Sequence, residues 1–307
     1  MDAWLQHTLD GLLQAGPYAL VGLGLTLGFG TLRRINLAYG ASAMLAAYVG
    51  AWLHARYHVH PLAVLAVVLA VAVLAGAYVE WLCFPGARGI DRTRSAGTTL
   101  GTGTDAREVV ALASSFAVWM QLEQLAVALL PHHLNAFPSW ASEREWTVLG
   151  LGLRPDRLGQ LLLELALVLA LSRWLQHSRG GLMWRASASQ VTAAHLVGVA
   201  VPRVQRIAFL ATSALAGLAA CVVLVVDGQV TPMFGMWMLV KGLVAAMLGG
   251  LGSVRGVLGG ALVLGLAEAY AQALGGALAR DATAWALLMV VLLWRARPGA
   301  ERRTAHA

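Results

Sequence analysis

Long apolar runs dominate this sequence, and they restrict the possible folds more than any other feature. The runs cover residues 11–32, 38–54, 61–82, 108–130, 159–177, 207–226, 235–251, 256–275 and 282–294. A helix needs roughly 20 apolar residues to cross a bilayer. Only 12% of the residues are charged, whereas soluble domains carry about 25%. We therefore expect one all-α domain over residues 1–307, a polytopic transmembrane helix bundle with about 8–10 spans and some discontinuous helices.

Arginine supplies almost all of the positive charge. The formal net charge is +7, and Lys241 is the only lysine. Basic residues near span ends stay on the cytoplasmic side of a membrane. Placing the N-terminus outside puts most loop arginines inside, so this orientation is favoured over its inverse. The charge therefore predicts orientation in a lipid membrane, and it does not require a nucleic acid partner.

Residues 178–206 form a polar, basic segment between two apolar runs. The segment has no acidic residue, and its arginines are Arg179, Arg185, Arg203 and Arg206. The pattern is typical of a short helix, on which Arg185, Ser189 and Ala193 would share one face because they are four residues apart. In the favoured orientation the segment is cytoplasmic and presents a helix to a partner. The alternative is an amphipathic linker that contacts nothing.

Two short segments interrupt the apolar runs, Asn-Leu-Ala-Tyr-Gly at residues 36–40 and a glycine-rich segment at residues 249–253. Non-helical backbone is tolerated inside a membrane only where it faces protein or a wet cavity. Interruptions in both halves of a chain therefore indicate a translocation path. The alternative is close helix packing, which the spacing of Gly252, Gly256 and Gly260 also favours.

Ionisable residues are rare within the apolar runs. They are Glu80, Glu123, Glu164, Lys241 and Glu268. Such residues are candidates for function in a membrane. The glutamates lie on separate runs, whereas a carrier coupled to protons or sodium gathers carboxylates near the midplane, so the pattern disfavours ion coupling. Lys241 has two candidate partners for a structural ion pair, Glu268 and Glu123.

No residue pattern indicates catalysis, a cofactor or a metal site. Lys241 is followed by glycine, so it cannot belong to a phosphate-binding P-loop. His54, His58 and His60 have no cysteine or carboxylate nearby to complete a metal site. The spacing of Cys83 and Cys221 does not suggest metal or redox chemistry, so we expect both cysteines to be packing residues. We therefore expect a chain that is not an enzyme and has no nucleotide-binding site of its own.

Three blocks of the sequence, residues 22–50, 181–204 and 241–269, resemble a known family in the same order. Together they are similar to the LivH-type permease subunit of branched-chain amino acid ABC importers, and the resemblance extends over nearly the whole chain. The sequence departs from the family pattern at Tyr39, where many relatives have histidine, and in the segment 83–107, which is longer than usual.

The resemblance implies a permease subunit that carries branched-chain or related amino acids across the bacterial inner membrane. Its partners would be two cytoplasmic ATP-binding subunits, a second similar permease subunit and a periplasmic substrate-binding protein. Alternatives are a relative that carries urea or short amides, or an ion-coupled secondary carrier. The residues expected to couple the chain to the ATPase are Arg185, Ala186, Ala194 and Gly198. Those expected in the pathway or its gate are Asn36, Tyr39, Gly40, Gly249, Gly250 and Gly252.

Overall fold

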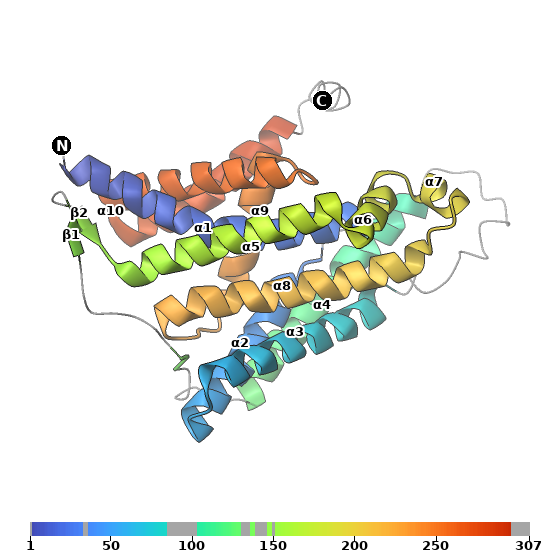
Figure 1. Cartoon of the computed structure of the whole chain (residues 1–307), viewed down its shortest axis with the longest axis horizontal. Coiled ribbons are helices and arrows are strands. Elements are labelled where there is room, and N and C mark those ends of the chain that lie inside the picture. The colour runs from blue at the N-terminus through green and yellow to red at the C-terminus, as the bar shows by residue number, and fades with distance from the viewer. Residues whose placement is uncertain are drawn as a thin grey trace.

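Nearly every described segment of the chain is helical. The structure, a computed structural model, describes residues 2–32, 36–84, 103–129, 136–138, 146–148 and 151–295 (Figure 1). The helices are α1 (Asp2–Leu32), α2 (Ala38–Tyr57), α3 (Pro61–Cys83), α4 (Gly103–Leu129), α5 (Pro155–His177), α6 (Arg179–Ser189), α7 (Val191–Leu196), α8 (Val201–Asp227), α9 (Phe234–Gly249) and α10 (Val254–Arg295). The strands β1 (Trp146–Val148) and β2 (Leu151–Leu153) pair antiparallel.

The apolar runs form the expected transmembrane bundle. Six described helices are long and apolar enough to cross a membrane, namely α1, α3, α4, α5, α8 and α10. α10 contains the last two predicted runs, which are separated at Gly276, where φ is 74° and ψ is −164°. α9 is a shorter apolar helix of 16 residues. The predicted polytopic all-α fold is confirmed.

The connections gather at two ends of the bundle. At one end, which we call the N-terminal end, Gln6 bonds to Gly152, and Phe137 donates its amide to the Gly228 carbonyl. At the other end, which we call the α6 end, Gln205 bonds to the Thr31 carbonyl beside α6 and the turn between α9 and α10. Figure 1 shows β1 and β2 at one end and α6 and α7 at the other. Connections therefore lie at both ends of the bundle, as a polytopic bundle requires. Which end faces the cytoplasm stays a prediction.

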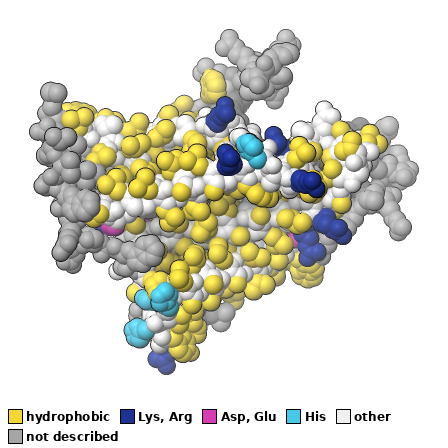
Figure 2. Space-filling model, viewed as in Figure 1, with side chains coloured by type: hydrophobic (Ala, Val, Ile, Leu, Met, Phe, Trp, Pro, Cys, Tyr) yellow, Lys and Arg dark blue, Asp and Glu magenta, His cyan; other side chains and the backbone are white. Residues whose placement is uncertain are grey.

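α1 is the central helix, and small residues let its neighbours approach it. It packs against α5, α8, α9 and α10. α2, which packs against α3, α4, α8 and α9, likewise buries mainly alanine and glycine, among them Ala38, Gly40, Ala43 and Ala47. Membrane helices associate through such small residues because lipid supplies no hydrophobic drive between them. The outer helices instead expose apolar side chains, which form the broad hydrophobic surface in Figure 2.

The polar segment 178–206 differs from the single helix that we expected. The chain is extended at Gln190 (φ −144°, ψ 101°), so α6 ends at Ser189 and α7 begins at Val191. The predicted common face of Arg185, Ser189 and Ala193 is therefore wrong. α8 already begins at Val201, with Pro202 in its first turn, so Arg203 and Arg206 belong to this long helix. Proline fits that position because a first-turn amide has no partner within the helix.

The remaining findings concern the connections between spans. The β1–β2 hairpin was not anticipated, because its short strands have no run long enough to produce an alternating pattern. In the connection between α3 and α4, residues 85–102 lie outside the described residues. The same holds for Arg33 and Arg34, for residues 130–135 and 139–145, and for the C-terminal residues 296–307.

Candidate functional site

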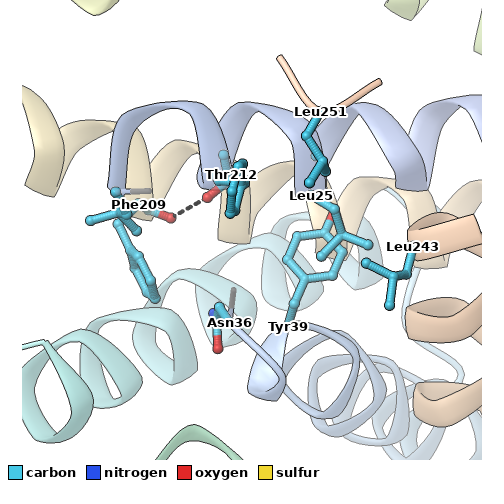
Figure 3. Close-up of a pocket in the computed structure, with 11 residues that line it drawn as sticks. Leu25, Asn36, Tyr39, Phe209, Thr212, Leu243 and Leu251 are labelled. Carbon is cyan, nitrogen blue, oxygen red and sulfur yellow. Dashed lines mark hydrogen bonds between the residues drawn. The ribbon is translucent and has the colours of Figure 1, made fainter. Parts of the chain in front are cut away.

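A small cavity lies at the centre of the bundle, where both predicted interruptions of the apolar runs meet (Figure 3). Its volume is about 20 Å³, which is room for a single water molecule. Asn36 and Tyr39 reach it from the first interruption, and Leu251 reaches it from the second. The rest of the wall is mostly apolar: Gly24, Leu25, Gly28, Phe29, Leu32, Phe209, Thr212 and Leu243.

Tyr39 is the main polar side chain beside this cavity. Its hydroxyl oxygen is buried and has no hydrogen-bond partner among the described residues. It lies against Gly24 of α1, so closely that a β-carbon at Gly24 would overlap it. The other hydroxyl in the wall, that of Thr212, donates to the Phe209 carbonyl at 2.8 Å (Figure 3). The phenol of Tyr39 is therefore a buried polar group beside the cavity without a partner in the described part of the chain.

The turn between α9 and α10 projects Leu251 into this wall. Gly250 and Gly252 have φ of 90° and 100°, a region that glycine adopts at no steric cost. Ser253 closes the turn, since its side chain accepts from the Gly256 amide at 3.1 Å and begins α10. The second interruption is thus a tight turn with a leucine at its tip.

A much larger cleft opens at the α6 end, directly beyond the central cavity. Its volume is about 750 Å³, and α1, α5, α6 and the turn before α10 line it. Phe29 and Leu251 line both this cleft and the central cavity. Arg185 and Gly252 also face the cleft. Two apolar side chains therefore lie where this open, partly polar cleft meets the small central cavity.

α6 is firmly attached to the end of α5. Ser178 accepts from the Gly181 amide at 2.8 Å, which caps α6. Arg185 donates to the Gln176 carbonyl at 3.2 Å, and the rings of Trp174 and Trp184 meet edge to face at 6.0 Å. A force applied to α6 would therefore act on α5, and through it on α1, against which both helices pack.

The predicted coupling residues occupy different positions within this segment. Arg185 is exposed on α6 beside Ala186, which is half-buried. Ala194 is buried, so it packs α7 against the bundle. Gly198 has φ of 84° in the turn after α7. Sequence reasoning missed Leu196 and Val197, which are 84% and 78% exposed.

The predicted pathway residues also divide into groups. Asn36 and Tyr39 line the cavity, and Gly250 and Gly252 shape the turn that carries Leu251. Gly40 instead lies against Gly235 of α9, and Gly249 lies against Gly256 of α10. These last two glycines serve helix contacts, which was the alternative explanation. Phe29 and Leu251 were missed because an apolar residue within an apolar run carries no distinguishing signal.

A cluster of charged side chains is buried between α1, α9 and α10. Lys241 donates to Glu268, which is one of its two candidate partners from the sequence. Tyr18 donates to the same carboxylate at 2.5 Å, and Arg280 approaches it at 3.4 Å. Asp281 lies 3.6 Å from the lysine. Since charged groups within a membrane protein are stable only when paired, the cluster joins α9 to both halves of α10.

The remaining intramembrane glutamates are not gathered at one place. Glu80 pairs with Arg206 at 3.5 Å, and Glu164 accepts from Gln160 at 3.0 Å. Among the described residues, no group of three metal-ligating side chains meets. His60 caps α3 by accepting from the Leu62 amide at 3.3 Å, and His54 contacts the Val59 carbonyl at 3.2 Å. These contacts give His54 and His60 structural roles.

The fold and the cavities define a class of protein: a helical membrane protein with broken helices around a small central cavity. Residues 7–294 match the family described as branched-chain amino acid transport system / permease component, and the chain belongs to this family. It is 26% identical to the high-affinity branched-chain amino acid transport system permease protein LivH of Escherichia coli K12, over 94% of this chain and 93% of the relative. It is 27% identical to the corresponding protein BraD of Pseudomonas aeruginosa, over 95% and 94%.

This membership confirms the predicted family resemblance. The chain is a permease, a multi-pass protein of the bacterial inner membrane, and a permease component is not in itself an enzyme. The three blocks that carried the resemblance contain the cavity residues Asn36 and Tyr39, α6, and the turn with Leu251.

Proposed function

We propose that this chain is the membrane-spanning subunit of an ABC importer for branched-chain amino acids, powered by separate ATPase subunits. One observation carries the proposal: Phe29 and Leu251 line both the central cavity and a cleft that α6 also lines. A movement of α6 would therefore act close to Phe29 and Leu251. A second permease subunit and a periplasmic binding protein complete the expected assembly.

The chemistry of the cavity supports an aliphatic substrate. Leucine and phenylalanine side chains make up most of its wall, with the phenol of Tyr39 and the amide of Asn36 as polar groups. Ligand sites of this kind bind an apolar body and fix its orientation with few polar contacts. Urea, which has no apolar part, fits this wall less well. The cavity of about 20 Å³ is too small for an amino acid, so the helices must separate to admit cargo.

The surface of α6 and α7 supports docking of an ATPase subunit. Leu182, Met183, Leu196 and Val197 are exposed there, close to the basic side chain of Arg185. A patch of exposed apolar residues with a polar rim is typical of a protein interface. In the favoured orientation this surface faces the cytoplasm, where nucleotide is available. The expected motion is a rigid-body shift of α6 with α5, which transmits to α1 and opens the central cavity.

Arg185→Glu is expected to uncouple the transporter. In vesicles that contain the complete assembly, ATP hydrolysis stimulated by the binding protein should fall at least about tenfold. The substitution reverses the charge at the proposed interface, which costs more than about 1.4 kcal/mol. Arg179→Glu is the matched control, since Arg179 lies on the same helix but does not line the cleft. Unchanged stimulation in Arg185→Glu would remove the coupling assignment. Uptake by the permease without ATPases, driven by an ion gradient, would instead support a secondary carrier.

Tyr39→Phe is expected to weaken transport without weakening the fold. The hydroxyl has no partner, so its removal leaves no other group unsatisfied, and the midpoint of thermal unfolding should stay the same or rise. If the phenol bonds to substrate, the KM for leucine uptake should rise about 5- to 10-fold, as one lost hydrogen bond predicts. Tyr48→Phe is the control, because Tyr48 also has an unpartnered buried hydroxyl on α2 but does not line the cavity. Equal KM values in both variants would contradict the assignment.

A further inference from the structure

A second polar cleft opens at the N-terminal end of the bundle, the end opposite α6 (Figure 1). Its volume is about 610 Å³, and it lies between the start of α1, β2, the start of α5 and the part of α10 around Gly276. Figure 1 shows these elements together at the end of the molecule that carries the N-terminus. Arg154, Arg157 and Arg280 line it, together with Asp10 and Gln14 of α1.

The arginines of this cleft differ in how their charge is satisfied. Arg154 is paired with Asp156 at 2.6 Å. Arg157 makes no hydrogen bond or ion pair with a residue that the structure describes, but its charge interacts with the carboxylate of Asp227 at the end of α8, as does the charge of Arg280. Arg280 is held from behind, since its Nη2 donates to the Tyr18 hydroxyl at 3.2 Å and its Nε lies 3.4 Å from Glu268. The buried cluster thus fixes the Arg280 guanidinium at the wall of the cleft, as an oriented site for an anion needs.

The α1 wall of the cleft offers acceptors. The Oε1 of Gln14 is buried and makes no hydrogen bond with a residue in the described part of the chain. Leaving such an acceptor unsatisfied costs about 1–3 kcal/mol, which a bound donor would recover. One turn earlier, Asp10 accepts from Gln6 at 3.2 Å through one carboxylate oxygen. Positive groups on one wall and acceptors on the other suit a ligand with both charges.

We propose that this outer cleft binds the zwitterionic head of an amino acid before it enters the bundle. The α-carboxylate lies against Arg157 and Arg280, and the α-ammonium donates to Asp10 and Gln14. This inference rests on the proposed function, because it takes an amino acid as the cargo. The cleft then recognises the part that all amino acids share, and discrimination among side chains takes place at the apolar central cavity.

Binding to the purified permease tests the inference without requiring transport. Leucine should raise the midpoint of thermal unfolding of the detergent-solubilised chain. Leucinamide, which lacks the carboxylate, and 4-methylpentanoate, which lacks the ammonium, should not. Alanine should act like leucine, because the side chain is not read here. A shift with leucine but none with alanine would place binding at the apolar cavity and overturn the inference.

Matched variants locate the effect. Arg157→Gln should raise the Kd for leucine at least about tenfold, since a charge-assisted contact is lost. Arg154→Gln should leave it within about twofold, because Asp156 already occupies that guanidinium. Equal Kd values in wild type and Arg157→Gln would contradict the inference, even if the assembly still imports leucine.

A zwitterionic lipid headgroup has the same chemistry as the proposed ligand. Short-chain phosphatidylethanolamine is therefore tested in place of leucine on the same variants. A thermal shift from this lipid alone, with none from leucine, would overturn the amino acid assignment. Failure of import in the full assembly together with leucine binding that depends on Arg157 would instead count against the proposed function and leave the cleft assigned.

Discussion

Replacing Glu268 with leucine is expected to lower the free energy of unfolding by about 3–5 kcal/mol, because it leaves a buried cation without its partner. Glu268 is 0% exposed and binds Lys241, Tyr18 and Arg280. In the variant, the remaining carboxylate near Lys241 is Asp281 at 3.6 Å, whose own side chain is largely exposed. The measurement is the midpoint of denaturant unfolding of the purified protein.

The chain offers a matched control for this substitution. Glu123 is also an intramembrane glutamate, half-buried on α4, and it makes no hydrogen bond or ion pair with a described residue. Glu123→Leu should leave stability unchanged or raise it, since an apolar residue suits the membrane better. Combining Glu268→Leu with Lys241→Met should recover part of the loss, because both charges are then absent. A Glu268→Leu variant as stable as wild type would show that the cluster does not hold α9 to α10.

The sequence predicted the bundle well because the bilayer imposes a length on each span. The apolar runs coincide with α1, α2, α3, α4, α5, α8, α9 and the two parts of α10 to within several residues. It also predicted that interruptions of the runs would matter, since a break in a membrane helix must face a cavity or protein. Asn36, Tyr39 and Leu251 meet at one cavity for this reason.

What the sequence did not predict depends on three-dimensional packing. The break at Gln190 has no glycine or proline to signal it, so residues 178–206 were taken as one short helix. Whether a glycine lines a cavity or a helix contact depends on its neighbour, and Gly40 turned out to face Gly235. Nothing in the sequence pairs Arg280 with Glu268, and only the fold brings the two side chains together. Local pattern places residues along the chain, but it does not choose their contacts.

Gly260→Ala and Gly259→Ala are expected to have opposite effects on stability, although the two glycines are adjacent in α10. A β-carbon at Gly260 would lie 2.8 Å from the Gly249 amide nitrogen and 3.1 Å from the Cβ of Leu248, both on α9. The helices would have to move apart, at a cost of about 1–3 kcal/mol. At Gly259 a β-carbon meets nothing within 4 Å, so alanine should stabilise the helix by up to about 1 kcal/mol.

The unfolding midpoints of the two variants decide whether the glycine repeat serves packing here. The same crossing positions the turn of Gly250 and Gly252, so spreading the helices at Gly260 would also shift Leu251 away from Phe29. Gly260→Ala should therefore increase the passive leak of leucine through vesicles, while Gly259→Ala should not. A Gly260→Ala variant that is as stable as wild type and leaks no more leucine would mean that α9 and α10 do not approach this closely. In that case the turn between them could not hold Leu251 beside Phe29.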